Sequence, residues 1–226
     1  MARDDKLKII YEDEDLLICH KRAGLATQTK KLTEADLCRQ VMAYLGKDAF
    51  VGLIHRLDQP VEGIVMFAKS KKAAGILSKS INEASMGKYY LALVEGRPES
   101  AVGEKILLSD YLLKDGRSNL SKVVKEGTTG AKLSKLEYEL LDSYEREDGV
   151  VSLLSVHLLT GRHHQIRLQL SHAGFPIVGD KKYGNGSMKA GGFPALCAER
   201  LVFRHPITNS LMDIKTKPEN GIFSLT

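Results

Sequence analysis

The residues best suited to chemistry stand in the segment His55–Asp58, which reads His-Arg-Leu-Asp. It places the carboxylate of Asp58 two residues after Arg56, shortly before the apolar segment Gly63–Lys69. That apolar segment has the length and continuity of a buried strand. A carboxylate at the edge of such a strand is either a structural ion-pair partner or a chemical group, and without a partner burial would drive it towards its neutral form.

A second polar segment, Leu159–Arg167, combines a Thr-Gly turn with two arginines, two adjacent histidines and a glutamine, which favours the chemical interpretation of Asp58. The histidines raise the alternative of a metal site, but their spacing fits no compact zinc pattern and no cysteine lies near them, so we predict no metal. The segment His55–Asp58 is also faintly similar to a kinase catalytic loop. A glycine-rich nucleotide loop and an Asp-Phe-Gly sequence are both missing, which excludes a kinase.

Composition places the chain among ordinary globular proteins. Its 226 residues are 43% apolar and 27% charged, enough for a substantial core in one domain or two closely joined lobes. The net charge of +5 is compatible with a polyanionic partner, although the absence of Trp and the 6% aromatic content argue against stacking platforms. Three widely spaced cysteines, an N-terminus without a signal peptide and the lack of a long apolar run predict a cytoplasmic protein that does not cross a membrane.

The pattern of apolar residues predicts a mixture of strands and helices without strict alternation, which indicates the α+β class. Strands are expected at 7–11 and 16–20 as a hairpin, and then at 63–68, 89–95, 136–140, 150–159, 195–203 and 211–216. Helices are expected from an N-cap at Thr33 to Leu45, after an N-cap at Ser70, and from His163 or His164 to Ala173. We expect a surface excursion at Lys114–Lys132 and a mobile basic loop at Asp180–Gly192.

Segments in order along nearly the whole chain resemble the RluA family of pseudouridine synthases. They lie at 10–25, 55–58, 63–69, 88–90, 161–167, 174–184 and 196–206. The resemblance implies an α+β domain with a mixed, largely antiparallel sheet and flanking helices. It also implies that uridine in RNA is isomerised to pseudouridine without a metal or other cofactor. Because the first matching segment lies close to the start, we expect a single catalytic domain over 1–226 without a preceding S4-type RNA-binding domain.

The resemblance also implies roles for individual side chains. Asp58 matches the essential catalytic carboxylate, either as a nucleophile or as the base that removes a proton from the sugar. Arg167 matches the arginine that pairs with it, and Tyr90 matches the active-site tyrosine that packs against the target base. Leu201 matches an apolar residue near that tyrosine. Arg56 matches the arginine that occupies the space left by an extruded uridine, because the glycosidic bond is hard to reach inside a stacked helix.

The partner that these features predict is structured RNA, either ribosomal or transfer RNA, with no membrane and no obligatory protein partner. Basic side chains are expected to hold its phosphate backbone. The candidates are His55, Arg56, Lys69, Arg162, Lys181, Lys182 and, in the predicted mobile loop, Lys189. A non-catalytic RNA-binding protein or RNA chaperone that retains the fold is the alternative function.

Several positions depart from the pattern usual in the family. Members often continue the aspartate with Arg-x-Thr-Ser-Gly, where this chain has Gln59-Pro60-Val61-Glu62-Gly63, so that Glu62 adds a second carboxylate four residues after Asp58. If Glu62 faced the site it would raise the pKa of Asp58; the other possibility is that it faces solvent. His163 stands where Thr or Ser is common, and Gln169 stands where His is common. These differences bear on substrate details and leave the expected chemistry in place.

Overall fold

The protein is described here from a computed structural model that covers residues 7–225 apart from 32, 84 and 185–191. The chain divides into two compact units, which are described separately. Unit 1 is formed by the described residues of Met1–Met86 and Ala198–Glu219, and unit 2 by those of Gly87–Cys197 and Asn220–Thr226. The expectation of a single catalytic domain over 1–226 stays a prediction.

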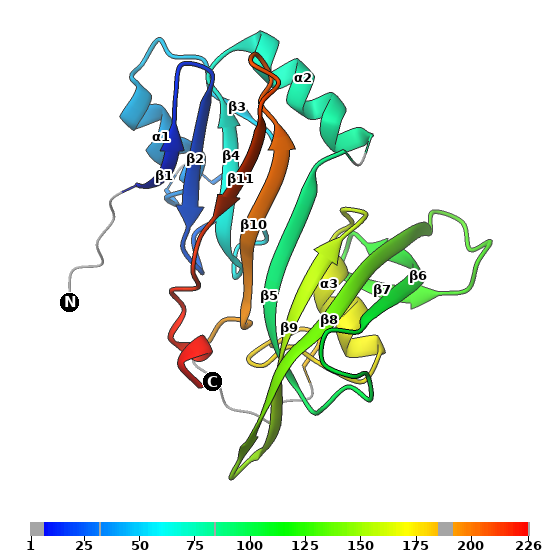
Figure 1. The fold of residues 1–226 in the computed structure, drawn as a ribbon. Coiled ribbons are helices and arrows are strands. Elements are labelled where there is room, and N and C mark those ends of the chain that lie inside the picture. The colour runs from blue at the N-terminus through cyan, green and yellow to red at the C-terminus, as the bar shows by residue number, and fades with distance from the viewer. Residues whose placement is uncertain (1–6, 32, 84, 185–191, 226) are drawn as a thin grey trace. The chain divides into compact units, whose positions relative to one another are not determined.

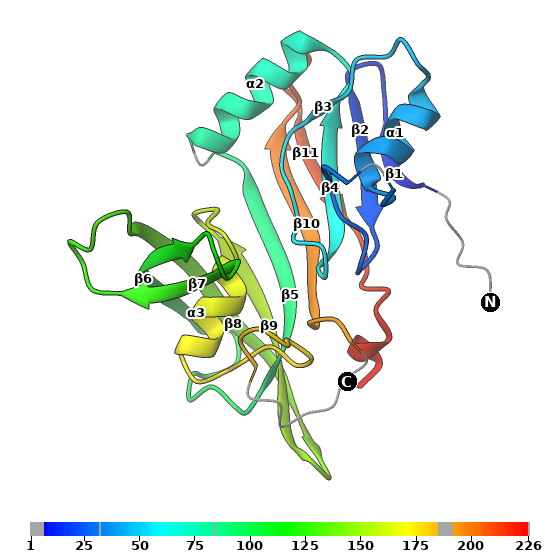
Figure 2. The same cartoon turned by 180° about the vertical axis from the view of Figure 1, so that it is seen from behind.

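Unit 1 is built on a sheet with two helices (Figure 1). Its strands follow the order β1-β2-β4-β10, with β3 paired to β4 and β11 paired to β10. The elements are β1 (Lys8–Glu12), β2 (Leu16–Lys21), α1 (Leu37–Leu45), β3 (Gly52–Leu53), β4 (Glu62–Ala68), α2 (Lys71–Asn82), β10 (Leu196–Arg204) and β11 (Leu211–Lys215). Helix α1 lies on the side of this sheet that faces the viewer in Figure 2.

The core of unit 1 explains why β2 and β4 read as nearly continuous apolar runs. Every residue of both strands is buried, and the two strands pair antiparallel along the whole of β2, from Leu16 opposite Ala68 to Lys21 opposite Gly63. Leu201 and Phe203 of β10 complete the same cluster from the other end of the chain. Gly63 allows β10 to approach β4 closely, because a Cβ at this position would lie 2.4 Å from the carbonyl oxygen of Ala198.

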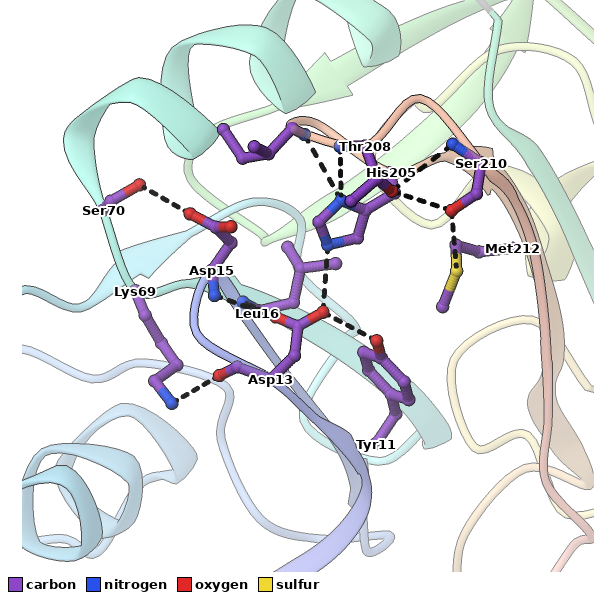
Figure 3. A network of polar contacts seen from close by, with 11 residues as sticks. Tyr11, Asp13, Asp15, Leu16, Lys69, Ser70, His205, Thr208, Ser210 and Met212 are labelled. Carbon is purple, nitrogen blue, oxygen red and sulfur yellow. Dashed lines mark hydrogen bonds and ion pairs between the residues drawn. The ribbon is translucent and has the colours of Figure 1, made fainter.

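A partly buried polar network joins the turn between β1 and β2 to the turn between β10 and β11 (Figure 3). His205 Nδ1 faces the backbone N–H groups of Ile207 and Thr208, so its proton sits on Nε2 and is donated to Asp13 Oδ2 at 2.9 Å. Asp13 also accepts the hydroxyl proton of Tyr11 at 2.6 Å. The network fixes one end of the sheet by hydrogen bonds between segments far apart in the sequence.

Unit 2 contains an antiparallel sheet and one α-helix. Its strands follow the order β5-β9-β8-β6-β7, and each neighbouring pair is antiparallel. The elements are β5 (Gly87–Glu95), β6 (Lys105–Asp115), β7 (Leu120–Val124), β8 (Lys132–Arg146), β9 (Gly149–Leu158), α3 (Gln165–His172) and the 3-10 turn η1 (Gly221–Leu225). Helix α3 lies in front of this sheet in Figure 2 and behind it in Figure 1.

The α+β class is confirmed, as are the first hairpin, the helix capped by Ser70 and the antiparallel pairing of most strands. Two local expectations are wrong. The first helix begins at Leu37 because Asp36, not Thr33, caps it by accepting the N–H of Arg39. The presumed excursion at Lys114–Lys132 is instead the β6–β7 hairpin and its connection, turned at Asn119 with a positive φ of 52°.

The predicted basic loop at Asp180–Gly192, with Lys189, falls largely outside the described residues, which omit 185–191. Over the described part of the chain, no helix combines the length and apolar character needed to cross a membrane.

Two glycine substitutions should change stability in opposite directions. Gly63→Ala places a methyl group against the backbone of Ala198 at a φ of +118°, so we expect the free energy of unfolding to fall by at least about 2 kcal/mol. Gly75 lies inside α2, and a Cβ at this position would have nothing within 4 Å. Gly75→Ala should therefore raise the free energy of unfolding by about 0.5–1 kcal/mol. Urea denaturation of both variants checks this, and a Gly63→Ala protein as stable as the wild type would contradict the close approach.

Candidate active site

Asp58 lies on the loop between β3 and β4, and backbone hydrogen bonds hold this loop on both sides of it. Before Asp58, Thr27 donates its hydroxyl proton to the carbonyl of Leu57 at 2.9 Å and accepts the Leu57 N–H at 3.2 Å. After it, the N–H of Gly24 donates to the carbonyl of Gln59 at 2.9 Å. The half-buried side chain of Asp58 therefore stands on a backbone whose position is set by neighbouring residues.

A buried lysine is hydrogen-bonded to the same loop. Lys21, at the end of β2, has no solvent-exposed surface. Its ammonium donates to three carbonyl oxygens, at 2.7 Å to Leu25 and at 3.1 Å to both Arg22 and Gln59. Burial lowers the pKa of Lys21 to about 7, against the attraction of the Asp58 and Glu62 carboxylates. Sequence patterns did not indicate a role for this residue, because its acceptors lie on two separate loops, one after β2 and one before β4.

Glu62 is a buried residue of β4, so the alternative in which it faces solvent is wrong. Its Oε2 accepts the backbone N–H of Glu219 at 3.1 Å and lies 3.6 Å from His20 Nε2. His20 in turn contacts the hydroxyl of Thr216 through Nδ1 at 2.9 Å. Glu62 thus anchors the chain that follows β11 to the middle of unit 1.

The other sequence-predicted residues of unit 1 have different surroundings. Arg56 is exposed and donates to the amide oxygen of Gln28 at 3.1 Å, and His55 is half-buried. The ammonium of Lys69 is bound by Glu12 Oε1 at 2.8 Å and by the Asp13 carbonyl at 2.6 Å, so it already has anionic and polar partners. Leu201 is part of the core cluster described above.

Two adjacent tyrosines on β5 point to opposite faces of the sheet, as successive strand residues do. The ring of Tyr89 stacks on His157 of β9, with centroids 4.5 Å apart and planes 14° apart. Tyr90 is 7% exposed and lies opposite Val156. The two rings therefore have different surroundings, and the match of Tyr90 to the active-site tyrosine of the family stays a prediction.

Arg167 on α3 forms a buried bidentate pair with Asp180. Its Nε and one terminal nitrogen donate to the two carboxylate oxygens at 2.6 and 2.7 Å, while its guanidinium carbon lies 5.4 Å from the ring centroid of Tyr183. Burial alone would raise the pKa of Asp180. The hydrogen bonds and charge of Arg167, with the N–H groups of Lys182 and Tyr183, outweigh it, and the net pKa is below its usual value.

The pairing of Arg167 with Asp58 stays a prediction, since the two residues belong to different units. Asp180 and Tyr183, by contrast, were residues of a matching segment to which sequence reasoning assigned no role.

The histidine pair at the start of α3 connects that helix to β7. His164, with a positive φ of 53°, places Nδ1 2.9 Å from the Tyr183 hydroxyl, which accepts the Ser121 N–H at 2.8 Å. His163 stacks on His164 with centroids 3.7 Å apart and lies 2.9 Å from the Ser121 hydroxyl through Nδ1. His163, one of the departures from the family pattern, therefore has partners of its own in Ser121 and Asn119.

Gln169, the other departure, is fully buried in a chain of side-chain amides. Gln165 donates a hydrogen bond to Gln169 Oε1 at 2.8 Å, and Gln169 Nε2 donates one to Asp110 Oδ2 at 2.7 Å. The Oε1 of Gln165 accepts from the Thr160 hydroxyl and from the Arg162 N–H. The chain of amides fixes the Thr-Gly-Arg turn against β6 and β8.

Arg162, Lys181 and Lys182 are exposed in unit 2, and their contact with RNA stays a prediction. Lys182 donates to the carbonyl of Asn119 at 2.8 Å, and the Nε of Arg162 is 3.5 Å from the carbonyl of Leu133. Among the residues that the structure covers, no three His, Cys, Asp or Glu side chains gather in an arrangement suited to a metal ion.

The sequence matches the family model for RNA pseudouridylate synthase over residues 15–172. It is 31% identical over 211 residues to the RNA pseudouridine synthase YhcT of Bacillus subtilis, a match that covers 92% of this chain and 67% of that protein. It is 30% identical over 222 residues to ribosomal large subunit pseudouridine synthase C of Escherichia coli K12, covering 95% and 67%. The chain thus spans about two thirds of the length of these relatives.

The fold is shared with two solved human structures. RNA pseudouridylate synthase domain containing 1 superimposes with a TM-score of 0.77 at 24% identity, covering 96% of this chain and 86% of that one. Domain containing 4 gives a TM-score of 0.74 at 20% identity, with 96% and 91% covered.

Removing the carboxylate of Asp180 should cost unit 2 much of its stability. Asp180→Asn leaves the Arg167 guanidinium buried against a neutral amide, and we expect the free energy of unfolding at pH 7 to fall by about 3–5 kcal/mol. Because the folded pKa of Asp180 is lowered, its contribution is present above the unfolded value of about 4 and is lost as the pH falls through the folded pKa. Denaturation at pH 7, 5 and 3 should show the difference from wild type shrinking only below about pH 4.

Asp213→Asn provides the matched control. Asp213 receives the same two hydrogen bonds from Arg200, at 2.7 and 2.9 Å, but this pair is exposed. Its loss should cost less than about 1 kcal/mol. Equal losses in the two variants would show that burial of the Arg167–Asp180 pair does not matter.

Proposed function

The chain belongs to the RNA pseudouridylate synthase family, and on that premise we propose that Asp58 is the carboxylate that acts on the uridine nucleotide. The enzyme is an isomerase of the RluA type that converts uridine in RNA to pseudouridine. The reaction exchanges the N–C glycosidic bond for a C–C bond: the base is released at N1 and reattached at C5, with a proton lost from C5 and one gained at N1. All the atoms of the substrate are kept.

The observation that carries the proposal is the fixed position of Asp58 within a matched segment. Leu57 and Gln59, on either side of it, are hydrogen-bonded through their backbones to the loop that follows β2. A carboxylate that attacks the sugar or removes one of its protons must be ionised and held still in the reacting geometry. Lys21, in its protonated form, attracts the ionised carboxylate, and the loop supplies the rigidity.

We assign the remaining catalytic roles to Tyr90 and Arg167. Tyr90 packs its ring against the target base, a role supported by its burial on β5 and by the engagement of Tyr89 with His157. Arg167 orients the carboxylate of Asp58 through charge-assisted hydrogen bonds. The support for this role is the rigid guanidinium, which Asp180 fixes through two hydrogen bonds. Leu201 is assigned to the apolar surroundings of Tyr90.

The proposed substrate is ribosomal RNA of the large subunit, a choice supported by the name of the Escherichia coli relative. Arg56, which is exposed, would occupy the space that an extruded uridine leaves in the RNA. His55, Arg162, Lys181 and Lys182 are assigned to the phosphate backbone. Lys69 is assigned there with less support, because its ammonium is already bound by Glu12.

Substitution of the carboxylate tests the assignment of Asp58. Asp58→Asn should reduce tritium release from RNA containing 5-tritiated uridine by at least about 1,000-fold, the scale seen when an enzyme loses its nucleophile or base. RNA binding should not weaken, because the change removes a negative charge that repels phosphate. Asp48→Asn, at an exposed position of the same unit, is the control and should release tritium at the wild-type rate.

Each outcome of this assay decides between the candidate functions. Release that persists in Asp58→Asn at the wild-type rate shows that another group does the chemistry. Binding without any release by the wild-type protein, on RNA known to contain the target, favours a non-catalytic RNA-binding protein or chaperone.

The choice of RNA is tested in cells. Deleting the gene should remove pseudouridine from one or a few positions of large-subunit ribosomal RNA, as read by pseudouridine mapping of total RNA. The wild-type gene should restore these positions and the Asp58→Asn gene should not. Loss confined to transfer RNA would contradict the proposed substrate while leaving the proposed reaction intact.

A further inference from the structure

Lys88, on β5, is a half-buried lysine whose charge the protein does not neutralise. Over the part of the chain that the structure describes, its ammonium makes no hydrogen bond or ion pair. Burial lowers its pKa, and no carboxylate opposes that shift. Two other lysines differ from Lys88 in having partners for their ammonium groups. Lys21 donates to three carbonyl groups, and Lys69 is paired with Glu12. Keeping a partly desolvated cation without a partner is unfavourable, which points to a ligand that supplies the anion.

The position of Lys88 ties it to the residues already assigned to the reaction. Side chains two apart on a strand project from the same face, so Lys88 shares a face of β5 with Tyr90, about 7 Å along the strand. Tyr89 lies on the opposite face, where it stacks on His157. The free ammonium therefore stands beside the ring proposed to contact the target base.

A glycine keeps the space next to this ammonium open. A Cβ added to Gly161 would lie 3.6 Å from Lys88 Nζ, at ordinary van der Waals contact, so a side chain larger than alanine at this position would compete for the space around the charge. The next residue, Arg162, is exposed, and the contact of its Nε with Leu133 is long, at 3.5 Å. The Lys88 ammonium thus lies next to the backbone of Gly161, and a second basic residue, Arg162, follows Gly161 directly in the sequence.

We propose that Lys88, beside the bare backbone of Gly161, binds a phosphate group of the RNA next to the nucleotide whose base contacts Tyr90. The inference rests on the proposed function, which makes RNA the substrate, and adds a specific phosphate contact to it. A lysine ammonium is a compact charge that binds phosphate without demanding a fixed geometry. Its half-buried setting makes the attraction stronger than that of the fully exposed Lys181 and Lys182.

The test compares charge removal at Lys88 with charge removal at an exposed lysine of the same unit. The probe is an unmodified transcript of large-subunit ribosomal RNA that carries 5-tritiated uridine. Filter binding over a range of KCl concentrations gives the affinity and its salt dependence, and single-turnover tritium release gives the rate. The variants are Lys88→Ala, Lys88→Gln and Lys88→Arg, with Lys105→Ala on β6 as the control.

We expect Lys88→Ala and Lys88→Gln to weaken binding about 10- to 100-fold at low salt, the range for loss of a hydrogen bond to a charged group. The slope of log affinity against log salt should become shallower by about 0.7–0.9, the change for one lost phosphate contact. Lys88→Gln keeps the length of the side chain, so it separates loss of charge from loss of packing. Lys88→Arg should recover most of the affinity, and Lys105→Ala should leave both quantities unchanged.

Two results would overturn the proposal. One is a salt slope for both Lys88→Ala and Lys88→Gln equal to that of the wild type and Lys105→Ala. The other is a Lys88→Arg protein that binds like the wild type but releases no tritium, which would assign the amine to the chemistry and not to a phosphate. Failure of the proposed function looks different, because the wild-type protein itself would then release no tritium.

Discussion

The buried charge of Lys21 is the constraint around which the functional part of unit 1 is arranged. An ammonium without exposed surface costs several kcal/mol unless polar groups surround it. Here the acceptors come from the loop after β2, through Arg22 and Leu25, and from the loop before β4, through Gln59. Because these carbonyls must converge on one point, the two loops are held together. The residue preceding Gln59 is Asp58. The position of the proposed catalytic carboxylate is therefore set by the hydrogen bonds that the buried ammonium of Lys21 requires.

Unit 2 uses the same physical device in another form. Arg167 and Asp180 neutralise each other in a buried pair, and the N–H groups of Lys182 and Tyr183 complete the carboxylate's hydrogen bonds. Tyr183 then reaches His164 and β7 through its hydroxyl. In both units a buried charge holds an irregular segment in place: the loop that carries Asp58 in unit 1, and the segment from Asp180 to Tyr183 in unit 2. Such segments have no regular ladder of hydrogen bonds to fix them, which is why the charges matter there.

Sequence reasoning succeeded where a single local signal decided the outcome. The continuous apolar runs of β2 and β4 predicted buried strands, and Ser70 predicted the start of α2. It failed where two local signals were equally good. Thr33 and Asp36 are both suitable helix caps, and Asp36 prevails because its other carboxylate oxygen also accepts the Thr29 N–H from a neighbouring loop.

The site was predictable only in part, for a related reason. The segments holding Asp58, Tyr90 and Arg167 were recognisable as sequence, whereas the partners of Lys21 and Asp180 depend on which loops meet in space. A lysine at the end of an apolar strand gives no local signal that a carbonyl 38 residues away will accept a hydrogen bond from it. The β6–β7 hairpin escaped notice because its second strand has neither a continuous apolar run nor a clear alternation. Pairing with β6 makes it a strand.

The interleaving of the two units along the chain sets the order in which they can form during synthesis. Unit 2 occupies nearly uninterrupted sequence between the two parts of unit 1. When the ribosome has released only the first part of unit 1, the core around β2 and β4 still lacks Leu201 and Phe203, and β4 lacks the neighbour that packs against Gly63. The first part of unit 1 therefore remains incomplete, with apolar surface exposed, while the middle of the chain is synthesised. Unit 2 can begin to fold during that interval, so unit 1, whose first part is made earliest, is completed only after β10 and β11 have been made.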